Sequence, residues 1–223
     1  MAAPSAFEEK APHQTMTMNR KRVGILIFPQ VEVLDFCGPF EVFSVTRLNE
    51  EKRREEPSPF EVVLIAASKD VVTASGGLRV LPDCDFENTP PLDVLVVPGG
   101  WGTRSGIHDE RLLGWIAAQA SKVETLTSVC TGAMLLGHAG LLEGRRATTH
   151  WRSLAWMRES FPQVRVEDQL HVVEDGNLLT SAGISAGIDM ALRVVTRTFG
   201  EAIGRATARQ MEYPYPEDNR RRV

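Results

Sequence analysis

The sequence predicts an α/β fold built on a mostly parallel sheet. Continuous apolar runs of strand length occur at 23–29, 60–67 and 93–98, as in strands that are covered on both faces. Helical patterns between such runs give the alternation that is typical of βαβ units. With 223 residues and 43% hydrophobic content, the chain is long enough for one sizeable domain of this class.

The composition divides the chain into one domain and two flanking segments. Residues 1–20 are polar and lack periodicity, so we expect a disordered N-terminal extension. The single α/β domain is expected at 21–212. Residues 213–223, with two prolines and three consecutive arginines, are expected to be an exposed C-terminal tail.

The first helix and a hairpin follow from local signals. Gly38-Pro39 precedes an apolar pattern at 40–45, which predicts a helix that begins near the proline. Two β-rich pieces around Ser75-Gly76-Gly77 predict a hairpin, and the Pro-rich stretch 82–91 is expected to be a connection.

The second half of the chain continues the alternation of strands and helices. The expected elements are helices at 109–119, 132–138, 154–157, 188–199 and 201–211, and strands or short extended pieces at 123–129, 147–151, 164–166, 171–173 and 178–183.

Charge and cysteine content limit the function classes. The formal net charge is -4 and the basic residues are dispersed, which argues against a nucleic-acid partner. Three cysteines without framework or metal-ligand spacing indicate a reducing compartment and predict no metal site. No signal peptide or spanning run is evident, so we expect a cytoplasmic protein without a membrane partner.

Cys130 is the best candidate nucleophile. It falls between a β-favouring run and a helical pattern, so it is expected on a strand-to-helix turn at the carboxyl end of a sheet strand. The positive end of the following helix would favour the reactive thiolate. The alternative is a small buried hydrophobic residue. Cys37 lacks this arrangement and is expected to be structural.

Several motifs together resemble one known family. The motifs are Pro98-Gly99-Gly100, the stretch 128–133 around Cys130, Ala147-Thr148-Thr149-His150-Trp151, the stretch 33–43 and the stretch 180–189. With them the sequence resembles the ThiJ/PfpI superfamily, and most closely its isonitrile hydratase-like branch. The resemblance runs from about Val23 to Met211.

The resemblance implies a flavodoxin-like three-layer sandwich with a nucleophile elbow, in a protein that is usually a homodimer. Carried over position by position, it implies Cys130 as the nucleophile and Asp35 as its acidic partner. It also implies Thr131 as a further catalytic residue and His150 as a histidine near the cysteine. Gly99 and Gly100, with the Thr131 backbone, would form the substrate- or oxyanion-binding turn.

Each of these residues also has a structural interpretation. Asp35 is suitably placed to cap the helix that is expected to follow it, and Thr131 is a suitable residue to start a helix. His150 is equally able to hydrogen-bond a backbone carbonyl. Trp101 and Trp151 are candidates for pocket walls, although aromatic packing in the core is the safer expectation.

Departures from related groups exclude some activities. Protease-like members place His directly after the nucleophile, where this chain has Thr131. Glutamine amidotransferases need a His-x-Glu pair, whereas His171 is followed by Val172-Val173-Glu174. Related regulators carry a helix-turn-helix domain after this module, and too few residues follow Met211 for one, so a DNA-binding regulator is not expected.

The function expected from the resemblance is a cysteine-dependent hydro-lyase that hydrates an isonitrile to an N-substituted formamide. It needs no metal or organic cofactor, and its partner is a small-molecule substrate. Two alternatives stay open. One is glyoxalase or deglycase activity on reactive dicarbonyls, and the other is a redox-sensing or ligand-binding dimer in which Cys130 is oxidised.

Overall fold

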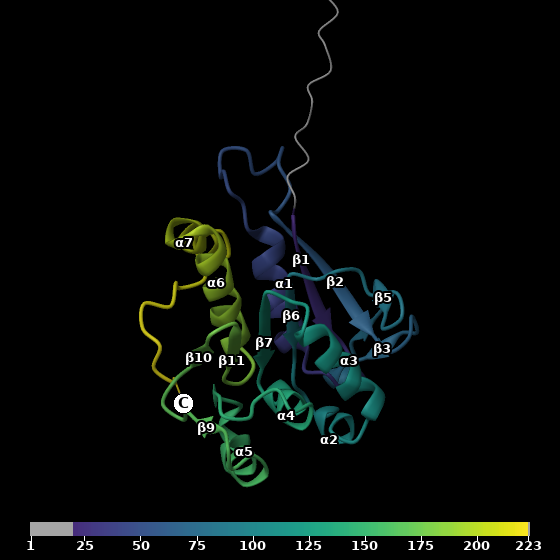
Figure 1. Cartoon of the computed structure of the whole chain (residues 1–223). Helices are drawn as coiled ribbons and strands as arrows, with labels where there is room; N and C mark the ends of the chain where they lie inside the picture. The colour runs from purple at the N-terminus through teal and green to yellow at the C-terminus, as the bar shows by residue number, and fades with distance from the viewer. Residues whose placement is uncertain (1–19, 223) are drawn as a thin grey trace, which may run out of the picture.

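A computed structural model describes residues 20–222, and Figure 1 shows how their elements are arranged. The extension expected at 1–20 lies outside these residues, apart from Arg20. The strands are β1 (Lys21–Leu26), β2 (Phe60–Ala66), β3 (Val72–Thr73), β4 (Arg79–Val80), β5 (Cys84–Asp85), β6 (Val94–Val97), β7 (Thr125–Val129), β8 (Arg146–Ala147), β9 (Arg165–Val166), β10 (Val172–Asp175) and β11 (Leu178–Ser181). The helices are α1 (Val33–Val45), α2 (Thr103–Gly106), α3 (Glu110–Ala120), α4 (Gly132–His138), α5 (Leu154–Ser160), α6 (Ala186–Phe199) and α7 (Glu201–Gln210), with short 3-10 helices η1 (Ser75–Gly77) and η2 (Trp151–Ser153).

Seven strands form the central sheet, in the order β10-β11-β7-β6-β1-β2-β5. All neighbouring pairs are parallel except β10 and β11, which a turn at Gly176 joins in antiparallel fashion. The central strands carry the apolar runs because both faces of the sheet are covered, and all four residues of β6 are buried.

Helices cover the sheet on both faces. α1, α6 and α7 pack against one another on one face, and α2, α3 and α4 lie together on the other (Figure 1). This is a three-layer α/β sandwich, which confirms the predicted fold class. The β3–β4 hairpin around η1 was also predicted correctly.

The first helix begins earlier than its sequence suggests. α1 starts at Val33, so the prediction of a start near Pro39 is wrong, and Pro39 lies inside the helix. A proline has no N–H, so the carbonyl of Asp35, four residues earlier, loses its usual helical donor. The early start places Asp35 in the first turn of α1, which residues 27–32 connect to the carboxyl end of β1. The stretch 82–91 likewise contains a strand, β5, that we did not predict. Prolines near β5 are tolerated because this strand pairs at the sheet edge.

Three loops meet at the carboxyl edge of the parallel strands. β1 leads to α1 with Asp35, β6 leads to Gly99 and Gly100, and β7 leads to Cys130. Such an edge is where open α/β sheets place their sites. The topology therefore gathers the predicted site residues from distant parts of the chain.

The C-terminal tail packs against the domain instead of lying exposed along its length. Residues 213–222 alternate between exposed and half-buried, and the chain end lies beside β9 and β10 (Figure 1). Arg220 forms an antiparallel bridge with Leu170, and Asn219 pairs with Val172 through both ends of its side-chain amide. The tail therefore covers the start of the edge strand β10.

Asn219 should contribute measurably to stability because its amide acts as a donor and an acceptor to one residue. Its Oδ1 accepts from the Val172 N–H at 2.9 Å and its Nδ2 donates to the Val172 carbonyl at 2.7 Å. We expect Asn219→Ala to lower the free energy of unfolding by about 1–2 kcal/mol. Asn219→Asp should lower it further, because a carboxylate oxygen then faces the Val172 carbonyl. Urea unfolding of both variants tests this, and an aspartate variant as stable as wild type would contradict it.

Candidate active site

Cys130 occupies a strained turn between β7 and α4. Its φ of 57° lies in the left-handed region that residues with a side chain rarely adopt. Its backbone N–H donates to the carbonyls of Ser181 and Ala182, and its own carbonyl accepts from the Thr149 hydroxyl at 2.8 Å. These bonds hold the turn, so the side chain projects at the carboxyl edge of the sheet as predicted. Cys130 is 6% exposed.

Asp35 is fully buried beside this turn. Its Oδ2 accepts from the Gly99 N–H at 2.8 Å, and its Oδ1 is buried without a hydrogen bond of normal geometry. Burial raises the pKa of Asp35 to about 8, although the Gly99 N–H opposes the rise and Glu32 adds to it. Cys130 and the Ile184 N–H are close enough to favour the charged carboxylate. Asp35 does not cap a helix end; it is an acid that holds its proton at neutral pH.

The structure corrects one expectation about Cys130. Burial raises the pKa of its thiol, and the neighbouring Asp35 charge raises it further. The N–H groups of Thr131 and Ile184 favour the thiolate, but they do not overcome these two effects. The thiol is therefore protonated at rest, and the helix start alone does not activate it.

Both N–H groups of the glycine turn after β6 already donate hydrogen bonds within the protein. The Gly99 N–H donates to Asp35, and the Gly100 N–H donates to the Thr131 hydroxyl at 3.0 Å. The Gly100 N–H is therefore engaged by Thr131 in this structure, and its donation to a substrate stays a prediction. A side chain at Gly99 would place a carbon 2.5 Å from the Thr131 nitrogen and 3.0 Å from Asp35 Oδ2, so only glycine fits there.

Thr131 links the elbow to that turn. It is the N-cap of α4, but its side chain makes no capping bond and instead accepts from Gly100 and from the Thr103 hydroxyl at 3.1 Å. The hydroxyl therefore fixes the distance between the loops that carry Cys130 and Gly100. This role differs from that of an ordinary helix-start residue.

His150 lines the same pocket but bonds elsewhere. Its Nδ1 accepts from the backbone N–H of Arg152, which leaves Nε2 to carry the proton in the neutral ring. Burial lowers the pKa of His150, and the charges of Arg152 and Arg221 lower it further. Within residues 20–222 it forms no hydrogen bond with Cys130 or Asp35.

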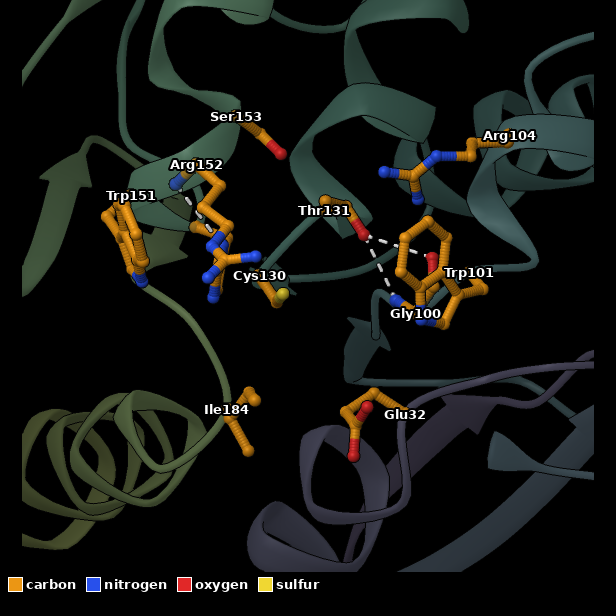
Figure 2. Close-up of a pocket in the computed structure, with 11 residues that line it drawn as sticks. Glu32, Gly100, Trp101, Arg104, Cys130, Thr131, Trp151, Arg152, Ser153 and Ile184 are labelled. Atoms are coloured by element: carbon orange, nitrogen blue, oxygen red, sulfur yellow. Dashed lines mark hydrogen bonds between the residues drawn. The ribbon is translucent and has the colours of Figure 1, made fainter. Parts of the chain in front are cut away.

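The site opens into a cavity of about 350 Å³ (Figure 2). The lining residues are Glu32, Gly100, Trp101, Arg104, Cys130, Thr131, His150, Trp151, Arg152, Ser153 and Ile184. Trp101 is 65% exposed and Trp151 is 50% exposed, so these tryptophans form the mouth of the pocket and are not core residues, contrary to the safer expectation.

Sequence reasoning gave no role to five of these residues. They are Glu32, Arg104, Arg152, Ser153 and Ile184. Ile184 has a φ of 58°, which is rare for a β-branched residue, and its N–H lowers the pKa of both Asp35 and Cys130. Only its position after Gly183, inside a motif of the resemblance, could have drawn attention to it.

Between residues 20 and 222 no three His, Cys, Asp or Glu side chains are grouped as metal ligands would be. No helix in that range has the length and apolar character needed to cross a membrane.

A comparison with family models decides the family. The model described as the DJ-1/PfpI family matches residues 21–197. The chain belongs to the DJ-1/PfpI family. The predicted resemblance to the ThiJ/PfpI superfamily is thereby confirmed.

Individual relatives of this DJ-1/PfpI protein include an enzyme and a regulator. It is 40% identical over 192 residues to isonitrile hydratase of Pseudomonas putida, which covers 86% of this chain and 78% of that protein. It is 37% identical over 142 residues to the HTH-type transcriptional regulator GbdR of Pseudomonas aeruginosa, but this covers only 38% of the regulator. A solved ThiJ/PfpI family protein from Pseudomonas syringae superimposes with a TM-score of 0.77 at 30% identity, covering 97% of this chain and 86% of that one.

Stability should depend on pH through Asp35. Because its pKa is raised from 3.8 to about 8, the folded state keeps a proton that the unfolded state loses, so stability falls as pH rises through this window. In Asp35→Asn this contribution is absent. We expect the free energy of unfolding of wild type, relative to that of the variant, to fall by a few kcal/mol between about pH 5 and pH 8. This corresponds to on the order of one kcal/mol per pH unit. Urea unfolding at both pH values measures this, and a constant difference would mean that Asp35 is buried as a carboxylate.

Proposed function

We propose that this protein is a cysteine-dependent isonitrile hydratase that converts R–NC and water to the formamide R–NH–CHO. One observation carries the proposal: the Cys130 thiol lies at a pocket floor beside a buried acid, Asp35, that can exchange protons with it. The similarity to isonitrile hydratase of Pseudomonas putida supports this reaction above others.

The first step adds the thiol to the isonitrile carbon. The reactive form of the Asp35–Cys130 pair holds one proton, as thiol plus carboxylate. Asp35 takes the thiol proton while the sulfur bonds to carbon, and then delivers that proton to the same carbon. The product is a thioimidate, R–N=CH–S–Cys130, and Asp35 is again a carboxylate.

The second step hydrolyses the thioimidate. Asp35 removes a proton from a water molecule while the water oxygen bonds to the thioimidate carbon, and that proton passes to the substrate nitrogen. The tetrahedral intermediate R–NH–CH(OH)–S–Cys130 then collapses. The carbon–sulfur bond breaks, the hydroxyl proton returns through Asp35 to sulfur, and the formamide leaves. No metal or organic cofactor takes part.

The neighbouring residues favour these charge changes. The N–H groups of Thr131 and Ile184 favour the thiolate, which forms as an attacking and then as a leaving group. Thr131 keeps Gly100 in place, and Gly99 keeps Asp35 oriented through its N–H. His150, neutral and with Nε2–H at the pocket wall, is available as a hydrogen-bond donor to substrate.

Turnover of cyclohexyl isocyanide tests the reaction and its nucleophile. We expect wild type to produce N-cyclohexylformamide, and Cys130→Ala to lower kcat by at least about a thousandfold, because no covalent intermediate forms. Cys84→Ala, which removes a thiol at the far sheet edge, is the matched control and should retain activity. Equal turnover by Cys130→Ala would refute the mechanism. Turnover of methylglyoxal without any isonitrile turnover would instead favour the dicarbonyl alternative.

The rate should rise with pH near neutrality. At pH below 8 most molecules hold a proton on both Asp35 and Cys130, and the singly protonated pair becomes abundant only as pH passes the Asp35 pKa of about 8. We therefore expect kcat/KM for cyclohexyl isocyanide to increase about tenfold per pH unit between about pH 6 and pH 7.5 and to level off above pH 8. A rate that falls over this range would show that the doubly protonated pair is the reactive form.

A further inference from the structure

The mouth of the pocket carries two arginine–tryptophan pairs on opposite sides of Cys130. The Arg104 guanidinium carbon lies 4.1 Å from the centre of the Trp101 ring, and that of Arg152 lies 4.8 Å from the centre of Trp151. Figure 2 shows one pair on each side of the pocket, with Cys130 between them. Each pair presents apolar ring surface next to a planar group of N–H donors.

These two guanidinium groups have no acidic partner in the part of the chain that the structure describes. Arg104 and Arg152 form neither an ion pair nor a side-chain hydrogen bond there, although both stand at an open cavity. Elsewhere on the surface Arg146 and Arg158 do pair with acids. The stacking on tryptophan holds the two guanidinium groups in place and leaves their donors directed to a ligand.

The local charge of the pocket is opposite to that of the whole chain. The formal net charge of the protein is -4, whereas the lining holds two arginines and one acid, Glu32, for a net charge of +1. Asp35 is fully buried and does not line the cavity, so it is not part of the surface that a ligand meets at the mouth. A ligand with a single negative charge therefore matches the pocket.

We propose that the preferred substrates are isonitriles whose R group carries a carboxylate, which Arg104 and Arg152 bind at the mouth while the isonitrile carbon reaches Cys130. This inference rests on the proposed function and specifies its substrate class. The carboxylate takes no part in bond making, so the reaction proceeds as described above. The cavity of about 350 Å³ suits a small R group with a flat or compact apolar part between the tryptophans.

A matched pair of substrates tests the preference. The 4-isocyanobenzoate anion and its methyl ester have the same ring and differ chiefly in charge. We expect wild-type kcat/KM to be at least about tenfold higher for the anion, from the charge-assisted hydrogen bonds to arginine, and this ratio should fall as sodium chloride is added. The electron-withdrawing ester is the more electrophilic isonitrile, so intrinsic reactivity works against the expected result.

Variants identify the groups responsible. In the double variant Arg104→Gln/Arg152→Gln the ratio of kcat/KM values should fall at least about tenfold, to near one, and each single variant measures the share of its arginine. Arg54→Gln removes one exposed positive charge in the loop before β2 and is the matched control, in which the ratio should persist. A wild-type ratio of one or less, or a ratio that survives in the double variant, overturns the proposal.

A binding measurement separates failure of this inference from failure of the proposed function. Benzoate should raise the melting temperature of wild type more than benzamide does, and the difference should vanish in the double variant. Hydration of the ester without preference for the anion, and no benzoate effect, would overturn the carboxylate site alone. A benzoate effect without hydration of either isonitrile would overturn the hydratase and keep an anion site at this pocket.

Discussion

The buried contact between Asp35 and Cys130 is the interaction on which the site depends. Burial raises the pKa of both groups, and the charge of Asp35 raises the pKa of the Cys130 thiol further, whereas the nearby thiol favours the charged form of Asp35. Both groups of the pair are therefore mostly protonated at neutral pH. In the proposed mechanism this suits addition of a thiol to a neutral carbon, in which one proton must move from sulfur to carbon, better than it suits a permanently charged thiolate.

The fold holds this pair with strained or glycine-only backbone. Cys130 and Ile184 both adopt left-handed φ values, and Gly99 has no room for a side chain. The strain is offset by bonds from outside the turn. The Thr149 hydroxyl donates to the Cys130 carbonyl, and Arg221 of the C-terminal tail donates to the Thr149 carbonyl. Arg221, which lies 91 positions after Cys130 in the sequence, thus helps to support the turn at Cys130.

The sequence predicted what depends on local pattern and missed what depends on tertiary contact. Apolar runs and turn residues were enough for the sheet, the hairpin and the position of Cys130 on its turn. The start of α1 was wrong because packing tolerates Pro39 inside a helix. The thiolate expectation failed because a helix start is visible in sequence, whereas burial beside Asp35 is not. We predicted an exposed tail at 213–223 because its residues are polar. The partners of these residues are evident only in the folded domain.

Recognition and chemistry are separated in space within this pocket. The groups that we propose to react, Asp35 and Cys130, lie at the floor, where electrostatic interactions are strong and a substrate charge would disturb the pair. The arginines lie at the mouth on exposed tryptophans, where water moderates their charge. A charged group there can orient a substrate without shifting the pKa values at the floor by much, because the interaction falls with distance and screening. Specificity at the mouth can therefore change from one family member to another while the buried pair stays the same.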